Sequence, residues 1–205
     1  MKLIADNLSL ERGGRRIVDG LSFTVSAGEA LVLTGPNGAG KTTLIRALAG
    51  FLPIAAGTVS LDGAPELEIA EQTHFIGHRD GVSGTLSVGE NAAFFANYLG
   101  DGAGKTCADA LDRLGLTALV DVPAAWLSAG QRRRLGLARL LLARRPLWLL
   151  DEPTVSLDSV AVATLAEIVG EHLAGGGIAV AATHIPLGLS GAREFRMGQA
   201  MPQTA

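Results

Sequence analysis

A glycine-rich segment between an apolar run and a helix-like pattern constrains this chain most. Residues 35–42 read Gly-Pro-Asn-Gly-Ala-Gly-Lys-Thr and fit the pattern G-x-x-x-x-G-K-[ST]. The apolar residues 30–34 before it suit a buried strand, and residues 41–49 place apolar side chains at helical spacing. The pattern predicts a strand, a phosphate-binding loop and a helix whose free N–H groups face the phosphates.

The residues expected at this loop have distinct tasks. Glycines let the backbone approach phosphate oxygens and adopt positive φ. Lys41 is expected to reach the β- and γ-phosphates, and the Thr42 hydroxyl to support Mg²⁺. The alternative is an ordinary strand-to-helix turn, which the flanking strand and helix patterns disfavour. The predicted nucleotide contacts are Gly35, Pro36, Asn37, Gly38, Ala39, Gly40, Lys41, Thr42 and Thr43.

Composition narrows the class of protein. The 205 residues suit a single domain over 1–205, and a net charge of −3 argues against a nucleic-acid partner. Arg132–Arg134 reads as a solvated helix face.

Although 48% of residues are hydrophobic, none of the apolar runs reaches membrane-span length. Residues 1–6 turn polar at once, so we expect a soluble cytoplasmic chain, with the lone Cys107 in the interior.

The order of predicted elements indicates an α/β fold. Strands after the loop alternate with helices, which favours a mostly parallel core sheet, while the early strands suit an antiparallel subsheet. A helical insertion is expected near residues 86–126, within a helical subdomain over about 78–145. The predicted strands are 3–10, 21–25, 57–63, 71–77, 147–150 and 178–182, and the helices are 88–99, 108–119, 130–143 and 160–173.

Two carboxylates follow the apolar run 147–150. Asp151, at the end of a core strand, is expected to hold Mg²⁺, and Glu152 to polarise an attacking water. The alternative is that the two carboxylates are only the acidic start of a helix that follows a strand. The presence of a phosphate loop in the same chain favours the catalytic interpretation. His184 follows the strand at 178–182, where a group that senses the γ-phosphate would lie. Asp158 lies further along the same segment, and its sequence position alone is typical of an acid that caps the start of the next helix.

The segment Leu127-Ser128-Ala129-Gly130-Gln131 starts a predicted helix. Ser128 either caps that helix or forms a second phosphate cradle with the exposed N–H groups. One nucleotide cannot easily occupy two cradles on one compact domain. A two-fold dimer resolves this, because each ATP then lies between the loop of one subunit and the cradle of the other.

With these segments in place, the chain resembles the ATP-binding subunits of ABC transporters, from Leu3 to about Met197. The resemblance implies ATP and Mg²⁺ as cofactors and a membrane permease as partner, contacted by residues 78–126. It makes residues 35–42 the Walker A loop and residues 147–151 the Walker B strand. It makes Glu152 the catalytic glutamate and His184 the switch histidine. It identifies residues 127–131 as the signature and residues 156–158 as the D-loop. The nucleotide contacts implied there are Ser128, Ala129, Gly130, Gln131 and Asp158.

Two positions depart from the family pattern. Arg12 stands where most members stack an aromatic ring on adenine, which puts base selectivity in doubt. His78 stands where most carry the glutamine that touches Mg²⁺, and an imidazole there makes coupling sensitive to pH.

Together with the run Leu127–Arg134 and the short C-terminus, these departures narrow the resemblance to one group of ABC proteins. In these features the chain is similar to the ATP-binding subunit of the haem exporter of bacterial cytochrome c maturation. That resemblance implies a homodimer on the cytoplasmic face of the inner membrane, bound to the exporter's permease and other maturation subunits without spanning the membrane. The alternatives are another small ABC exporter or a soluble ABC ATPase.

Overall fold

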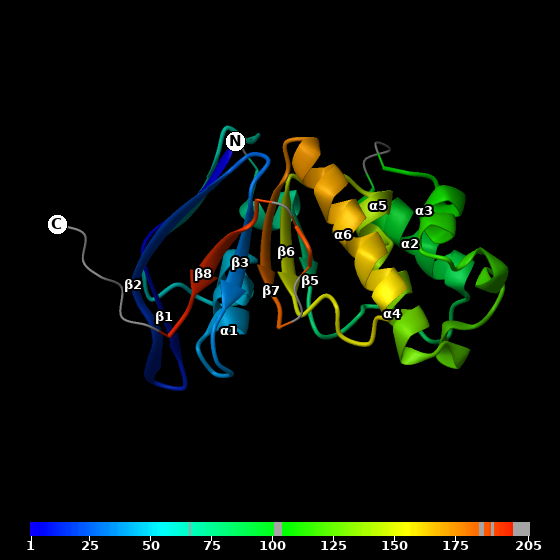
Figure 1. The fold of residues 1–205 in the computed structure, drawn as a ribbon, viewed down its shortest axis with the longest axis horizontal. Helices are drawn as coiled ribbons and strands as arrows, with labels where there is room; N and C mark the ends of the chain where they lie inside the picture. The colour runs from blue at the N-terminus through cyan, green and yellow to red at the C-terminus, as the bar shows by residue number, and fades with distance from the viewer. Residues whose placement is uncertain (66, 101–103, 185–186, 190, 199–205) are drawn as a thin grey trace.

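The computed structural model describes all residues except 66, 101–103, 185–186, 190 and 199–205. Its first part is a long hairpin of β1 (Lys2–Arg12) and β2 (Arg15–Ser26), which turns at two glycines with positive φ. Strand β4 (Ala56–Asp62) pairs antiparallel with the other side of β1. The result is a three-stranded sheet in the order β2-β1-β4 (Figure 1).

A second sheet is parallel throughout and lies beside the first. Its order is β5-β6-β7-β3-β8, so the strand that leads into the phosphate loop lies between β7 and the edge strand β8. The carboxyl ends of its strands therefore share one edge, and the loops that leave them meet there. The strands are β3 (Ala30–Thr34), β5 (Thr73–Ile76), β6 (Leu147–Asp151), β7 (Ile178–Ala182) and β8 (Arg193–Arg196).

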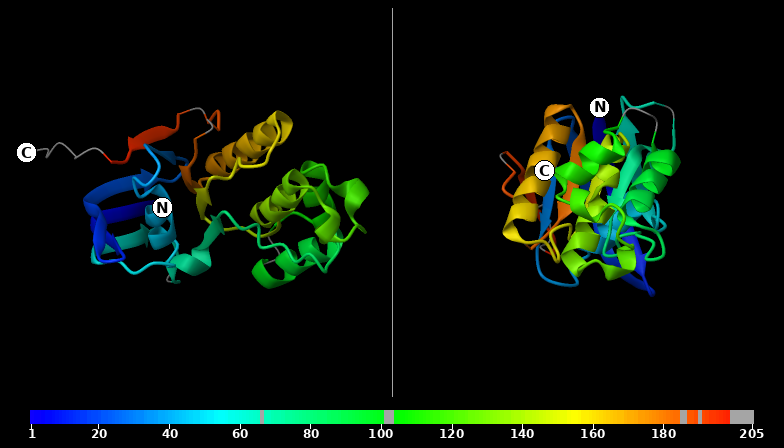
Figure 2. Two further views of the ribbon diagram at one scale, coloured as in Figure 1. Left: turned by 90° about the horizontal axis from the view of Figure 1, so that it is seen from below. Right: turned by 90° about the vertical axis from the view of Figure 1, so that its right-hand side faces the viewer.

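Helices cover both faces of the parallel sheet. Helix α1 (Lys41–Leu48) lies on the side of the antiparallel sheet, and α6 (Ser159–Ala174) lies on the other side (Figures 1 and 2). Four further helices gather beyond α6, away from the chain termini. They are α2 (Val88–Leu99), α3 (Cys107–Arg113), α4 (Ala129–Leu137) and α5 (Arg139–Leu142), and the short 3₁₀ turns are η1 (Ile69–Gln72), η2 (Thr117–Leu119) and η3 (Ala124–Trp126).

Strand β6 shows how the sheet separates two apolar cores. Successive side chains on a strand point to opposite faces. Leu147 and Leu149 pack with α1 and the antiparallel sheet, whereas Trp148 and Leu150 pack with α6 and the outer helices. All five residues of β6 are buried, which explains the uninterrupted apolar run in the sequence.

The structure confirms most predicted elements and corrects several. The helix expected over 108–119 ends at Arg113, because Gly115 adopts a φ of +64° and a 3₁₀ turn follows. The helix expected over 130–143 breaks at Ala138 into α4 and α5. Only residues 73–76 of the expected strand 71–77 are extended, and β8 had not been predicted.

Two expectations about single side chains also change. Cys107, expected in the interior, is half-buried at the first residue of α3. Arg133, expected on a solvated helix face, is 4% exposed. Among the residues that the structure describes, no helix is long and apolar enough to cross a bilayer.

Candidate nucleotide-binding site

The phosphate loop depends on three glycines for its shape. Gly35, Gly38 and Gly40 have φ of +127°, +82° and +97°, which L side chains rarely adopt. A Cβ on Gly35 would lie 2.5 Å from the carbonyl oxygen of Met197, and one on Gly40 would lie 2.8 Å from a methyl of Ile17. The loop therefore fits tightly between the end of β8 and the β1–β2 hairpin.

Lys41 begins α1 and turns its side chain back into the loop. The side chain is buried, and Nζ donates to the carbonyl oxygens of Gly35 and Pro36 at 2.7 and 3.0 Å. Its ammonium thus lies where the loop backbone curves around it. Pro36, Asn37 and Gly38 are exposed, whereas Thr43 is a buried residue of α1.

Thr42 and Asp151 meet although they come from different elements. The Thr42 hydroxyl donates to Asp151 Oδ1 at 2.9 Å, and Asp151 is 6% exposed at the end of β6. A hydroxyl and a carboxylate are hard oxygen ligands of the kind Mg²⁺ takes beside phosphate oxygens. Over the described residues, no group of three or more His, Cys, Asp and Glu side chains forms a metal site by itself. These two residues fit a cation that a nucleotide helps to hold.

Glu152 and His184 face each other across the same edge. Glu152 adopts a left-handed φ of +49°, and its N–H donates to the carbonyl of Ala182 at 2.8 Å. The His184 N–H donates to Glu152 Oε2 at 3.3 Å, and Nε2 of its ring lies 3.4 Å from Oε1. Both side chains stay partly exposed. The structure thus brings together the two residues predicted to be catalytic.

The signature segment forms the start of α4, as predicted. The Ser128 hydroxyl accepts the N–H of Gln131 at 3.2 Å, and the Gln131 side chain accepts the N–H of Ser128 at 2.9 Å. This reciprocal capping box confirms the capping interpretation. Ser128 and Ala129 are nevertheless exposed. Gly130 packs closely against the D-loop, since a Cβ there would lie 2.7 Å from Ser156 O.

Asp158 has the capping role that the sequence left open. Its Oδ1 accepts the N–H of Ala161 at 2.8 Å at the start of α6. Ser156, two residues earlier, has a φ of +67°. The segment between β6 and α6 therefore has a defined backbone conformation.

The two residues that depart from the family pattern are both exposed. Arg12 is exposed at the end of β1, opposite Arg15 in the hairpin. His78 is exposed on the loop after β5 and lines a hollow of about 410 Å³ with Ala129, Arg132 and Ser156. His78 thus lines the same hollow as the first residue of α4.

Arg133 is the site residue that the sequence interpretation missed. Its guanidinium donates to the carbonyls of Glu152, Pro153 and Gly77, at 2.8, 3.2 and 2.7 Å, and to Asp80 Oδ1 at 2.9 Å. A signal was available in the helical pattern. Arg133 stands four residues before Leu137, which is buried, and so belongs to the inner face of α4.

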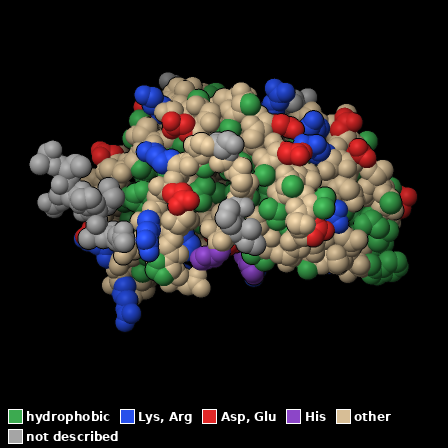
Figure 3. All heavy atoms as spheres, in the orientation of Figure 1, with side chains coloured by type: hydrophobic (Ala, Val, Ile, Leu, Met, Phe, Trp, Pro, Cys, Tyr) green, Lys and Arg blue, Asp and Glu red, His purple; other side chains and the backbone are tan. Residues whose placement is uncertain are grey.

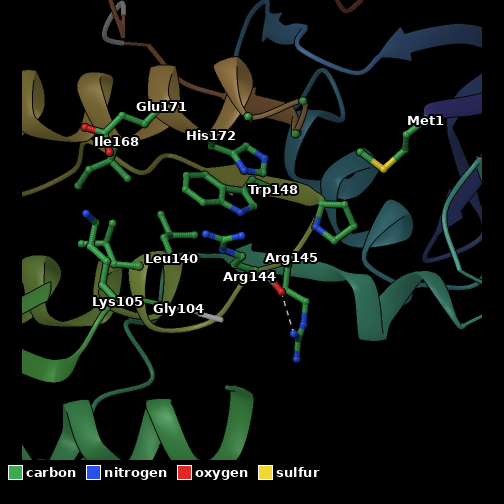
Figure 4. A pocket seen from close by; sticks show the side chains of 15 residues that line it. Met1, Gly104, Lys105, Leu140, Arg144, Arg145, Trp148, Ile168, Glu171 and His172 are labelled. Atoms are coloured by element: carbon green, nitrogen blue, oxygen red, sulfur yellow. Dashed lines mark hydrogen bonds between the residues drawn. The ribbon is translucent and has the colours of Figure 1, made fainter. Parts of the chain in front are cut away.

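A larger cavity of about 460 Å³ lies at the other edge of the sheet, near the start of β6 (Figure 4). The rings of Trp148 and His172 stack there at 3.9 Å, beside Lys105 and Arg144. Burial lowers the pKa of His172 to about 4. None of the predicted nucleotide contacts lines this cavity, so it is separate from the phosphate loop.

Known proteins are similar to this chain in sequence and in fold. The profile of the family described as ABC transporter matches residues 18–155. "Cytochrome c biogenesis ATP-binding export protein CcmA" of Nitrobacter winogradskyi is 52% identical, with 98% of this chain and 100% of that protein covered. The protein of the same name from Rhodopseudomonas palustris strain BisB5 is 51% identical, with 98% and 100% covered.

A solved ATP-binding subunit of an ABC transporter has a similar structure. It superposes with a TM-score of 0.77 at 25% identity, over 90% of this chain and 80% of that one. The fold is therefore the ABC-type ATPase fold, which binds nucleotide. By its profile, its full-length relatives and its fold, the chain belongs to the ATP-binding subunits of ABC transporters, among the CcmA-like proteins.

Proposed function

We propose that this protein is the ATP-hydrolysing subunit of an inner-membrane export complex for cytochrome c biogenesis. One observation carries the ATPase assignment: the Thr42–Asp151 hydrogen bond joins the phosphate loop to the strand that ends in Glu152. The printed name of the relatives, an ATP-binding export protein of cytochrome c biogenesis, supplies the process.

The chain's own residues divide the work on ATP. The N–H groups of residues 35–42 and the Lys41 ammonium bind the phosphates. Thr42 and Asp151 would hold Mg²⁺, with His78 on the loop after β5 as a further candidate ligand, and the bound ion would supply positive charge to the β- and γ-phosphates. Glu152 orients a water and accepts its proton, and His184, which contacts the Glu152 carboxylate, holds the γ-phosphate side of the site.

A homodimer completes the site in this proposal. The start of α4 presents exposed Ser128 and Ala129, and the D-loop lies directly against Gly130. The N–H groups at this helix start can bind an anion from a second subunit. ATP then joins two copies, and hydrolysis releases them. Asp158 caps α6 at the end of the D-loop, and in this proposal it also contributes to the nucleotide site.

The helical region over about 78–145 is proposed as a subdomain that docks the permease. Four large apolar side chains are exposed there, and Phe94 stacks on Tyr98 with ring centroids 5.5 Å apart. Figure 3 shows hydrophobic side chains at the end of the molecule formed by these helices. Hydrophobic side chains exposed together at one end of a molecule are typical of interaction sites. The four are Phe94, Tyr98, Val120 and Trp126, which are 52%, 76%, 39% and 78% exposed.

The test is co-purification from bacterial membranes. Tagged chain should bring down a haem-export permease and retain ATPase activity, as expected of a subunit on the cytoplasmic face of the inner membrane. Lys41→Ala should abolish turnover in that complex but not its assembly. A permease of another export system would reassign the process while keeping the ATPase role. Recovery of active ATPase without any membrane protein would support a soluble ABC ATPase instead.

A further inference from the structure

Arg133 is a buried cation that joins three segments of the chain. It belongs to α4, directly after the signature, and only 4% of its surface is exposed. Its guanidinium makes four hydrogen bonds, two to the loop after β5 and two to the loop after β6. A planar group with several fixed donors can serve such divergent acceptors, whereas a lysine ammonium cannot.

On one side, Arg133 fixes the loop that carries His78. Its Nη1 donates to Gly77 O at 2.7 Å and to Asp80 Oδ1 at 2.9 Å, so bonds lie immediately before and two residues after His78. Arg139 donates to the carbonyl of Asp80. Gly136 packs so closely that a Cβ would lie 2.9 Å from Asp80. The loop that carries His78 is therefore attached to both α4 and α5.

On the other side, Arg133 fixes the backbone of Glu152. Nη2 donates to Glu152 O at 2.8 Å, and Nε donates to Pro153 O at 3.2 Å. Glu152 has a φ of +49°, a conformation that persists only where its surroundings determine it. These two bonds hold the peptide that follows the catalytic carboxylate, and so help to set where that carboxylate points.

We propose that Arg133 is a positioning residue that couples the His78 loop to Glu152. The inference rests on the proposed function, because it takes Glu152 as the base and His78 as part of the loop that faces the permease and Mg²⁺. A displacement of the loop or of α4 then shifts the Glu152 backbone through one guanidinium. Hydrolysis therefore depends on how the helical region is placed.

Arg133→Lys tests the coupling, because it keeps the charge and removes the fork. In the purified chain, kcat for ATP should fall about 10- to 100-fold, since small misplacements of catalytic groups have effects of that size. The KM and Kd for ATP should stay nearly unchanged, because the phosphate loop is not touched. Arg145→Lys is the control: Arg145 also donates to carbonyls, those of Arg144 and Leu99, but lies at the far edge of the sheet.

A double variant separates positioning from general damage. In single-turnover assays, Arg133→Lys should add little to the loss caused by Glu152→Gln, because both act through one carboxylate. A full additional loss in that background, or unchanged kcat in Arg133→Lys, would overturn the proposal.

Two further outcomes keep the tests distinct. If Arg133→Lys fails to fold, Asp80→Asn, which weakens the same clamp, should lower kcat at constant KM, and unchanged kcat would refute the coupling. If Glu152→Gln itself retains turnover, the proposed role of Glu152 is wrong and the inference falls with it, whereas loss of turnover in Glu152→Gln with unchanged kcat in Arg133→Lys overturns the inference alone.

Discussion

The Thr42 hydroxyl donates to Asp151 Oδ1 at 2.9 Å and joins two segments that lie 109 residues apart. Neither residue alone defines a site. Together they place a hydroxyl and a nearly buried carboxylate at the carboxyl edge of the sheet, beside Glu152. The consequences for binding, hydrolysis and assembly can each be tested.

Glu152→Gln should separate binding from hydrolysis. The change keeps the shape of the side chain and removes the proton acceptor, so turnover should fall by roughly 10²-fold or more. ATP binding should persist, because the phosphate loop is unaltered. Steady-state turnover and nucleotide-binding titrations measure the two effects. Normal turnover would remove Glu152 from its proposed role.

Ser128→Ala should prevent ATP-dependent dimerisation while monomers still bind ATP. The loss of a cap destabilises a helix by about 1 kcal/mol, so a matched control is needed. Ser87 caps α2 with the same type of box, through Glu90. Ser87→Ala should lose similar stability and still dimerise in sedimentation with ATP. Normal ATP-induced dimers of Ser128→Ala would argue against the second cradle.

Arg12 predicts weak selection between ATP and GTP. A guanidinium stacks on any planar base, and Arg12 is exposed at the end of β1. Competition binding should therefore show a preference below about 10²-fold, a difference of roughly 2.7 kcal/mol. Arg12→Tyr should bind ATP at least as well, because an aromatic ring stacks equally on adenine. A strong native preference for ATP would refute this account.

Two buried histidines should make stability depend on pH. Burial lowers the pKa of His74 to about 4 and that of His172 to about 4, below the ordinary value of 6.5. Below pH 6.5 the unfolded chain therefore binds more protons, and the free energy of unfolding falls until about pH 4. The loss between pH 7 and pH 5 should be about 2 kcal/mol for each histidine.

Urea denaturation at pH 7 and pH 5 measures that loss. His172→Gln should reduce the difference between the two pH values, because it removes one of the two buried imidazoles. The same pH dependence in the native protein and in His172→Gln would contradict the assignment.

The exposed aromatic side chains should govern attachment to the permease. Tyr98→Ser and Trp126→Ser together remove the two most exposed of the four large apolar side chains in the helical region. We expect the isolated chain to keep its ATPase activity and to lose co-purification with membranes, because an apolar contact area is removed. Leu67→Ser, at a position 57% exposed outside the helical region, is the control. Undiminished co-purification would place the docking surface elsewhere.

Local patterns predicted most of the fold. The run 147–150 is apolar because both faces of β6 are buried, and the glycines at 35, 38 and 40 mark a loop with positive φ. Strand β8 was not predicted, because the charged residues of Arg193–Arg196 carry no apolar alternation; it forms by pairing with β3. The end of α3 at Arg113 depends on one glycine, Gly115, inside a pattern that otherwise continues.

The residues of the candidate site that belong to sequence motifs were predictable. Thr42, Asp151, Glu152 and His184 lie at one edge because each follows or adjoins the end of a parallel strand. Arg133 was misjudged because three consecutive arginines resemble a solvated face, and only the turn of α4 decides which one points inward. Its acceptors are mostly backbone carbonyls, which leave no mark in a sequence.

The close approach of Gly130 to the D-loop has a consequence for variation at this motif. Neighbouring Ala129 faces outward and already carries a methyl group, so that position tolerates larger side chains sterically. At Gly130 even a methyl group would collide with the carbonyl oxygen of Ser156. A saturation library across this pair should thus recover many folded replacements at the first position and almost none at the second.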